Sequence, residues 1–560
     1  MLTRKPTAYV AALAALALLL TGCLGGLVGV APSVTGRTPV DVSQPSPFPG
    51  EGVRDADLAA HVPGEILVGV ESREVAERVA LKLDGQVTGY LEPIGVAKIE
   101  LNDKSRSLTD AMRSLKGEPG VRYAQANFID YVRPVSKVEQ ATLDLGALSV
   151  GADQLDFIDD PDSLYNRHQY GPRVIGAEAA WTQGLTGKDT ILAVIDTGIN
   201  TSHIFFSTAG KILTGWNPDL SSTDYEDWNG HGSHVAAIAA GVFHSSGFAG
   251  LAPDAQILPI RVFNSDGATN WAVAAGLIIA ADPSLVGLPY RPADVANMSL
   301  GGAVYSLAVQ DAANFALDRG VVVVVSMGNT ENKAVRYPAA YQGVIAVGAS
   351  DAHDNKTDFS TSGPHISVMA PGQAIFSAYA GSAGSVAWAS GTSMAAPHVS
   401  GAVLLLKEAY PDATPAQIKD LLERTADFKE GYSFNEYGYG RINLARALAA
   451  GLDGARPLGG IEVYVYTGDG QPVPEAEVTL WRGKGEQAEM VPWPIRTGGY
   501  GDTPVPYHGL AFFRELDPGD DYWLTVHLDE TYHGKHEMKV VDNITVRPND
   551  VTYVSVRVDL

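Results

Sequence analysis

The sequence predicts an α/β protein whose central domain holds a mostly parallel sheet, preceded by a small α+β domain and followed by a β-sandwich. Long apolar runs lie in the central region, at residues 190–198, 255–263, 294–302, 320–328 and 343–351. Runs of this kind are typical of parallel strands buried on both faces. Helical patterns separate them, such as Trp271–Ala281 and Ser306–Arg319. Alternating strands between turn clusters end the chain, and they predict the sandwich.

The composition is that of a globular protein with several hydrophobic cores. The chain has 560 residues, of which 45% are hydrophobic, and this length allows roughly four domains of ~150 residues each. The formal net charge is −24, and no basic stripe is present. The charge balance therefore argues against nucleic acid as a partner.

Residues 1–23 have the organisation of a secretory signal: a basic start, the apolar run Ala8–Leu20 and then Leu-Thr-Gly-Cys. This ending resembles the lipobox of bacterial lipoproteins, in which cleavage before the cysteine leaves it lipidated. Cys23 is the only cysteine of the chain, so it cannot form an internal disulfide. We expect export across the inner membrane and a lipid anchor at Cys23 in the cell envelope. A plain signal peptide, or an uncleaved anchor within residues 7–35, is the alternative.

Residues 24–54 form a predicted spacer, because the stretch 31–52 is rich in Pro, Ser, Thr and Gly and such a composition gives an extended, semi-flexible chain. Residues 55–134 then follow the order strand, helix, strand, strand, helix, strand. This order predicts a small α+β domain. The acidic stretch 135–164 connects it to the central domain.

Motifs in the central domain, residues 165–454, place an aspartate, a histidine and a serine in that order. Asp196 ends a predicted strand, and His231 lies between glycines at the start of an Ala-rich helix. Ser393 begins the helical run Ser393–Ala409, whose unpaired N-terminal N–H groups can bind a developing negative charge. A serine nucleophile requires a base and a group that orients the base. Together these residues indicate nucleophilic catalysis.

Taken singly, each residue has an ordinary structural explanation. Ser393 alone could cap a helix, His231 alone could be a hydrogen-bonded loop histidine, and Asp196 alone could also be a cap. Their joint occurrence in the order Asp, His, Ser favours catalysis. The neighbouring His234 and His398 are interpreted as structural.

With these motifs in this order, the central domain resembles the subtilisin-like serine proteases, the subtilase family. The resemblance implies a three-layer subtilisin-like fold and a serine endopeptidase that hydrolyses polypeptide substrates through an acyl-enzyme, with no cofactor required for the chemistry. It assigns Asn329 to the oxyanion hole together with the Ser393 N–H. It also assigns the backbone of Ser299, Leu300 and Gly301 to pairing with an extended substrate peptide.

The resemblance extends to the region before the central domain. The strand and helix order of residues 55–134 is similar to that of the subtilase propeptide, which assists folding and blocks the active site as an intramolecular inhibitor. An unrelated α+β domain is the alternative. We expect this zymogen to be processed within the linker 135–164, which would release the catalytic domain from the anchor at Cys23 into the medium.

By the same resemblance, the primary specificity pocket is walled by Ser299 to Gly301 and by Ser326, Met327 and Gly328. The residue before Tyr337-Pro338 lies near the base of this pocket, and here it is Arg336. Its guanidinium could shorten the pocket or favour an acidic side chain before the scissile bond. The alternative is that Arg336 points into solvent.

The chain differs from many members of the family at the residues of the usual calcium site. Many subtilases bind a structural ion through an aspartate and an asparagine at positions that hold Phe205 and His244 here. Calcium requires oxygen ligands, so the usual strong site is not supported and no metal ligand is assigned. A calcium ion at another acidic loop, such as Asp224–Asp227, stays open, although that loop reads as solvated surface.

Residues 459–560 read as an antiparallel β-sandwich that resembles carboxypeptidase-regulatory-like modules. His527, His533 and His536 could suggest a metal site, but they are interpreted as exposed strand and turn histidines. The sequence does not choose between substrate binding, envelope binding and stabilisation as the role of this domain.

The main alternative function is a catalytically idle surface lipoprotein that only binds peptides in the groove. The complete set Asp196, His231, Asn329 and Ser393 argues against it, because a binding role needs no such set. A specific processing protease, rather than a degradative one, is a further alternative for which Arg336 is the hint.

Overall fold

The structure, a computed structural model, describes part of the chain: residues 49, 54–131, 139–143, 155–264, 267–331, 335–341, 343–363, 365–452, 459–467, 473, 476–483, 489–490, 495–496, 510–516, 519–528, 537–546 and 551–558. The predicted signal with Cys23, nearly all of the predicted spacer, and the histidines His533 and His536 lie outside the described residues. Within these ranges, no helix combines the length and the hydropathy needed to cross a membrane.

The central sheet is parallel, as the continuous apolar runs predict. Its strands lie in the order β12-β11-β10-β9-β6-β7, and every neighbouring pair is parallel. Their bounds are β6 (Ile191–Asp196), β7 (Gln256–Arg261), β9 (Val295–Met298), β10 (Val322–Ser326), β11 (Ile345–Ser350) and β12 (Val368–Pro371). These strands are almost entirely buried.

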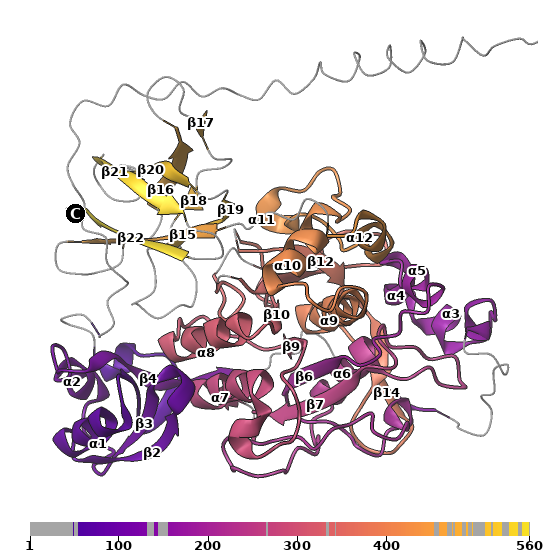
Figure 1. The fold of residues 1–560 in the computed structure, drawn as a ribbon, viewed down its shortest axis with the longest axis horizontal. Coiled ribbons are helices and arrows are strands. Elements are labelled where there is room, and N and C mark those ends of the chain that lie inside the picture. The colour runs from indigo at the N-terminus through magenta and orange to yellow at the C-terminus, as the bar shows by residue number, and fades with distance from the viewer. Residues whose placement is uncertain are drawn as a thin grey trace, which may run out of the picture.

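Helices cover both faces of this sheet and give a three-layer arrangement (Figure 1). Alternate residues of each strand enter different cores: Leu192 and Val194 pack with α6 (His231–Ala240) and α9 (Thr392–Ala409). Ala193 and Ile195 pack with α7 (Asn270–Ala281) and α8 (Leu307–Asp318). The predicted fold class is confirmed, and the period of two along each strand explains why the runs are apolar throughout.

Small residues allow α6 and α9 to approach closely. A Cβ atom on Gly401 of α9 would lie 2.9 Å from the carbonyl oxygen of Ala239 in α6, so a larger residue there would push the helices apart. The other helices of this region are α3 (Leu164–His168), α4 (Tyr170–Val174), α5 (Glu178–Trp181), α10 (Pro415–Arg424), α11 (Phe434–Tyr437) and α12 (Leu444–Ala450).

The order of the strands in the central sheet determines where a ligand site can lie. From β6 the chain continues to β7 on one side, whereas β9 lies on the other side of β6. The loops that leave the carboxyl ends of β6 and β9 therefore separate, and in open α/β sheets such a reversal creates a crevice where ligands bind. Asp196 is the last residue of β6, and Ser299 directly follows β9.

The N-terminal domain is an α+β unit with the predicted element order (Figure 1). Its sheet has the order β2-β3-β1-β4, and β4 also pairs with β8 of the central region. The helices pack against this sheet around a core that includes Ile66, Val79 and Met112. The bounds are β1 (His61–Val70), α1 (Arg73–Lys82), β2 (Gly85–Leu91), β3 (Val96–Leu101), α2 (Leu108–Arg113), β4 (Val121–Tyr131) and β8 (Gly267–Thr269).

This domain docks against α7 and α8. The Asn127 side-chain oxygen accepts a hydrogen bond from the Trp271 N–H at the start of α7 (3.0 Å). The Gln125 amide nitrogen donates to Ser306 Oγ at the N-cap of α8 (2.7 Å). An ion pair between Arg122 and an aspartate on α8 lies further along the same interface.

The predicted linker 135–164 contributes to the central domain more than a bare connection would. Strand β5 (Glu139–Thr142) pairs with β14 (Ser385–Ala389), which itself pairs with β13 (Ile375–Ala378). Phe157 is buried in the core among Tyr165 and Trp181. Burial of an aromatic side chain in that core requires these residues to fold with the central domain.

The C-terminal region has two sheets around one core, as a sandwich requires. Strand β15 pairs with β22 in parallel, so the expectation of a purely antiparallel sandwich is wrong at this pair. A parallel pairing is possible because β20 and β21, which precede β22 in the chain, lie in the second sheet and give the connection the length that parallel strands need. The strands are β15 (Gly459–Thr467), β16 (Glu477–Arg482), β17 (Glu489–Met490), β18 (Ile495–Arg496), β19 (Leu510–Leu516), β20 (Gly519–Leu528), β21 (Glu537–Val546) and β22 (Val551–Val558).

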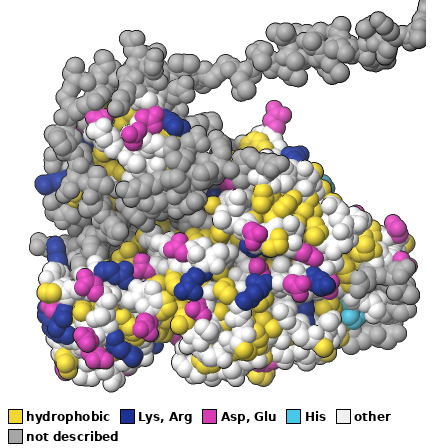
Figure 2. All heavy atoms as spheres, in the orientation of Figure 1, with side chains coloured by type: hydrophobic (Ala, Val, Ile, Leu, Met, Phe, Trp, Pro, Cys, Tyr) yellow, Lys and Arg dark blue, Asp and Glu magenta, His cyan; other side chains and the backbone are white. Residues whose placement is uncertain are grey.

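On the face of the molecule drawn in Figure 2, basic and acidic side chains are interspersed over the described surface, with apolar side chains between them.

Candidate active site

The Asp196 carboxylate and the His231 imidazole are directly hydrogen-bonded. Asp196 ends β6 and His231 begins α6, and His231 Nδ1 lies 2.8 Å from Asp196 Oδ1. Both side chains are buried, and the same carboxylate oxygen accepts the Thr197 N–H (2.7 Å). The bond to Nδ1 fixes the ring orientation and leaves Nε2 as the nitrogen that can accept a proton.

Asp227 holds the start of α6 in place. Its Oδ1 accepts hydrogen bonds from Thr197 Oγ1 (2.9 Å) and the Gly230 N–H (2.8 Å), and its Oδ2 accepts from the N–H and hydroxyl of Ser233 (2.9 and 2.6 Å). Asp227 is only 3% exposed, so the interpretation of loop 224–227 as solvated surface is wrong for this residue. Burial is stable here because the carboxylate is fully hydrogen-bonded.

Gly230 is required by geometry. Its φ is +103°, and a Cβ atom would lie 2.6 Å from the Tyr379 ring. A side chain at position 230 would collide with the Tyr379 ring. The backbone directly before His231 would then have to move.

Competing effects determine the pKa of His231. Burial disfavours the charged ring, but the Asp196 carboxylate, through its charge and its hydrogen bond, and the more distant Asp227 charge favour it. The net result is a pKa above the usual value for histidine. The protonated form of His231, the imidazolium, is therefore stabilised. A catalytic base takes this form when it accepts a proton.

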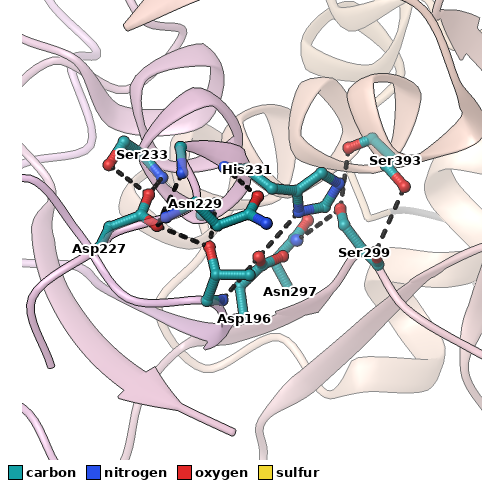
Figure 3. Close-up of polar contacts among 11 residues, drawn as sticks. Asp196, Asp227, Asn229, His231, Ser233, Asn297, Ser299 and Ser393 are labelled. Carbon is teal, nitrogen blue, oxygen red and sulfur yellow. Dashed lines mark hydrogen bonds and ion pairs between the residues drawn. The ribbon is translucent and has the colours of Figure 1, made fainter. Parts of the chain in front are cut away.

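Ser393 and Ser299 form two hydrogen bonds with each other, and each hydroxyl is the donor of one. Ser393 Oγ donates to the Ser299 carbonyl (3.2 Å), and Ser299 Oγ donates to the Ser393 carbonyl (2.8 Å). Figure 3 shows the His231 ring between Asp196 on one side and Ser393 with Ser299 on the other. The structure thus brings the residues of the three motifs into one site.

Two buried residues behind Ser299 hold α9 against β9. Asn297 Nδ2 donates to Ser299 Oγ (3.0 Å), and Asn297 Oδ1 accepts from Ser400 Oγ of α9 (2.8 Å). These bonds position the helix that carries Ser393 relative to the strand end. The motifs in the sequence assign no role to Asn297, although a polar residue in an apolar strand is a signal that can identify it.

Asn329 lies beside the N-terminus of α9. Its Oδ1 accepts hydrogen bonds from both the N–H and the hydroxyl of Thr392 (2.9 Å each). This orientation gives the Nδ2 group a fixed direction, and Nδ2 would lie 3.3 Å from a Cβ atom on Gly391. The Ser393 N–H belongs to the first turn of α9, where N–H groups have no intrahelical acceptor. Two N–H donors therefore lie near the serine.

One predicted pocket segment directly follows β9, and the other begins at Ser326, the last residue of β10. Leu300 and Met327 have side chains in the hydrophobic core, so these residues can offer only their backbone to a ligand. Beyond Gly301, Gly302 forms reciprocal backbone hydrogen bonds with Tyr337 (2.9 Å each). Ser299, Gly301, Ser326 and Gly328 complete the segments.

Arg336 is half-buried next to one of these segments. Its Cγ would lie 3.3 Å from a Cβ atom on Gly328. Its charge also acts on Asp130, a residue of β4 in the N-terminal domain. The side chain is therefore close to one of the predicted pocket segments and acts on β4 of the N-terminal domain, and its role at the pocket base stays a prediction.

The residues at the usual calcium positions form an aromatic cluster. Phe205 stacks on Phe248 with ring centroids 3.7 Å apart and an angle of 5°, and the His244 ring lies 5.8 Å from Phe205. Phe205 is fully buried. This apolar packing leaves no oxygen ligand from those side chains, so the residues do not fit a calcium ion there. In the described ranges, no group of three or more His, Cys, Asp or Glu side chains is arranged to hold a metal.

His234 and His398 lie near the motifs but face backbone groups. His234 Nε2 is 3.1 Å from the carbonyls of Ile375 and Ala387, and His398 Nδ1 is 2.9 Å from the Met394 carbonyl. Burial lowers the pKa of His234 to about 3 and of His398 to about 4. Both rings are neutral and structural, as their positions suggested.

Comparisons with known proteins agree on the relationship. The sequence pattern of the subtilase family matches residues 187–440, and that of the fervidolysin N-terminal prodomain matches residues 49–127. Thermitase from Thermoactinomyces vulgaris is 40% identical over 289 residues, which is 51% of this chain and 98% of thermitase. Fervidolysin from Fervidobacterium pennivorans is 30% identical over 504 residues, 82% of this chain and 68% of fervidolysin.

The same relationship is found between structures. The crystal structure of fervidolysin, described as a keratinolytic enzyme related to subtilisin, superposes with a TM-score of 0.65 and 27% sequence identity. The alignment covers 94% of this chain and 82% of that protein. The likeness therefore spans the N-terminal and central domains together.

Proposed function

The chain belongs to the subtilase family of serine proteases and carries a prodomain of the fervidolysin kind, and from this premise we propose that it is a serine endopeptidase with Asp196, His231 and Ser393 as its catalytic triad. The observation that carries the proposal is the 2.8 Å contact between His231 Nδ1 and Asp196 Oδ1, with Ser393 on the opposite side of the ring.

In the proposed mechanism, Ser393 Oγ attacks the substrate carbonyl carbon while its proton passes to His231 Nε2. Asp196 holds the ring in the required tautomer and stabilises the imidazolium. The oxyanion receives hydrogen bonds from the Ser393 N–H and from Asn329 Nδ2. His231 then protonates the leaving amine, and water hydrolyses the acyl-enzyme by the same route.

Substrate would bind as an extended strand along Ser299–Gly301. The precursor itself forms strand pairs with the central domain: β4 lies against β8, with Ile129 to Tyr131 opposite Thr269 to Gly267, and β5 lies against β14. These pairs end at Tyr131 and begin again at Glu139. We therefore expect processing between Tyr131 and Glu139, at the start of the predicted linker, and the N-terminal domain acts as an intramolecular inhibitor until it leaves.

We also propose a secreted protein with a lipid anchor at Cys23. Because the anchor precedes the prodomain, processing would free the catalytic domain. Active enzyme in the medium is the expected result, and active enzyme found only as membrane-bound full-length chain would contradict it.

The test of catalysis compares residues 32–560 with a Ser393→Ala version and with Ser207→Ala, a control at an exposed serine. Intact mass and cleavage of casein are measured for each. We expect the wild type and the control to lose the N-terminal domain and digest casein, whereas Ser393→Ala stays full length and inactive by about 10⁴-fold or more. Cleavage by Ser393→Ala at the wild-type rate would overturn the assignment. Keratin is a useful second substrate, because the related fervidolysin is described as keratinolytic.

A further inference from the structure

Asp130, near the end of β4, inserts a carboxyl group of the N-terminal domain into the central domain. In the pairing of β4 with β8, Asp130 lies opposite Ala268. Its Oδ1 lies against Gly302, where a Cβ atom would collide with it. Asp130 is 7% exposed. The carboxyl group is therefore buried against the residue that follows the segment Ser299–Gly301.

The polar group of the central domain beside this carboxyl is Asn270, the first residue of α7. Asn270 Nδ2 donates to Asp130 Oδ2 (3.2 Å). Asn270 is 1% exposed, and its Oδ1 has no hydrogen-bond donor among the residues that the structure describes. A buried acceptor without a donor is unfavourable, so a group that also donated a hydrogen bond would bind better here.

A planar group with one donor and one acceptor matches the Asn270 amide. An asparagine side chain could donate to Asn270 Oδ1 while it accepts from Asn270 Nδ2. A protonated aspartic acid offers the same pair, with its O–H as the donor. An ionised carboxylate offers acceptors only, and an aliphatic side chain offers neither.

The electrostatics of Asp130 agree with a neutral acid. Burial raises its pKa to about 7, against the opposing effects of the Asn270 hydrogen bond and the Arg336 charge. Arg336 is the charged group that acts on Asp130 from the central domain. On the adjoining strand β1, His61 opposes Phe128, but its ring is hydrogen-bonded to the Ala59 carbonyl. The Arg336 charge does not outweigh burial.

We propose that Asn270, with Ala268 and Gly302, forms an upstream substrate subsite selective for asparagine, or for aspartic acid in its protonated form, with Asp130 as its occupant in the precursor. The proposal rests on the proposed function, because the subsite becomes available to substrates only after the N-terminal domain leaves. Asn270 and Gly302 belong to the central domain and stay in the mature enzyme. The selectivity arises from a buried amide, and Arg336 has a secondary role.

The test uses peptides that reproduce residues 126–142 with Asp, Asn or Leu at position 130. The self-processed wild-type enzyme cleaves each peptide at pH 5.5 and pH 8.5, kcat/KM is measured, and product masses locate the cut. At both pH values we expect the Asn peptide to be cleaved about 10-fold or more faster than the Leu peptide. The Asp peptide should fall below the Asn peptide at both pH values, and by about 10-fold or more further at pH 8.5 than at pH 5.5. Comparison with the Asn peptide cancels the titration of His231.

Variants at position 270 assign the selectivity. In Asn270→Leu, the ratio of kcat/KM for the Asn peptide to kcat/KM for the Leu peptide should fall to about 1; this ratio is measured within one variant, so it does not depend on how much of the variant is active. In Asn270→Asp, the ratio for the Asp peptide to the Asn peptide at pH 8.5 should fall below its wild-type value, because two carboxylates would then meet.

The possible outcomes distinguish a failure of the proposed subsite from a failure of the proposed protease function. Equal rates for all three peptides in the wild type would overturn the subsite and leave the protease assignment intact, whether or not the variants mature. Retained selectivity in Asn270→Leu would also overturn it. If no peptide is cleaved, or if Ser393→Ala cleaves them equally, the proposed function itself fails.

Discussion

Thr197 and Asp227 are joined by a 2.9 Å hydrogen bond between the threonine hydroxyl and the carboxylate. Thr197 directly follows Asp196, and its hydroxyl oxygen also accepts the N–H of Gly232, the residue after His231 (2.9 Å). The bond therefore ties the end of β6 to the first turn of α6. The distance between the Asp196 and His231 side chains depends on this connection.

Replacement of Asp227 by Asn should lower kcat/KM by about 10-fold or more, because small misplacement of catalytic groups is costly. The Asp227 charge helps to raise the pKa of His231. His231 acts as a base when neutral, so loss of that charge lowers its pKa and shifts the acid limb of the pH–rate profile to lower pH. Asp224→Asn, at a side chain that is 52% exposed, is the matched control and should change neither. An unchanged profile for Asp227→Asn would contradict this role.

Replacement of Asn329 by Ala should lower kcat by about 10²- to 10³-fold with little change in KM, because an oxyanion donor acts mainly in the transition state. Thr392→Val removes one of the hydrogen bonds that orient the Asn329 amide, so it should cause a smaller loss. Steady-state kinetics on one peptide substrate measure both. A rise in KM with normal kcat for Asn329→Ala would instead indicate a role in ground-state binding.

Retention of the cleaved N-terminal domain should depend on pH through Asp130. Its pKa is raised from 3.8 to about 7 in the docked state, so docking takes up a proton between about pH 4 and pH 7. Affinity should fall by about 10-fold per pH unit across this window and stay constant above it. Co-elution of the two processed parts in size-exclusion chromatography measures this. Asp130→Asn should remove the dependence, and the exposed Asp110→Asn should retain it.

The aromatic cluster at Phe205 should stabilise the central domain without calcium. Phe205→Ala should cost about 3–5 kcal/mol, as expected for loss of a buried aromatic side chain, and Phe428→Ala, at a side chain 53% exposed, should cost little. Denaturant unfolding of the inactive Ser393→Ala background gives both values without self-digestion. The cost of Phe205→Ala should be the same with and without a chelator. A cost that disappears in the chelator would show that an ion, rather than ring packing, holds this segment.

The layers of the central domain and the identity of the candidate triad could be predicted from the sequence. Runs such as 190–198 show by their continuous apolarity that both faces are buried, which is a local property of the chain. Asp196, His231 and Ser393 stand at element ends that hydrophobic patterns and glycines mark. The helix bounds agree to within one or two residues, as for α7, expected at 271 and found to begin at Asn270.

The sequence by itself thus determined which elements form, in what order, and which side chains carry the proposed chemistry. Only the tertiary structure decided that Asp227 is buried rather than solvated, that Asp130 contacts Asn270, and that the Arg336 charge acts on Asp130. The physical reason is that periodicity and capping depend on near neighbours in the chain. The burial and partners of a polar side chain depend instead on groups that the fold brings from far away, as it brings Asp130 to a residue 140 positions later.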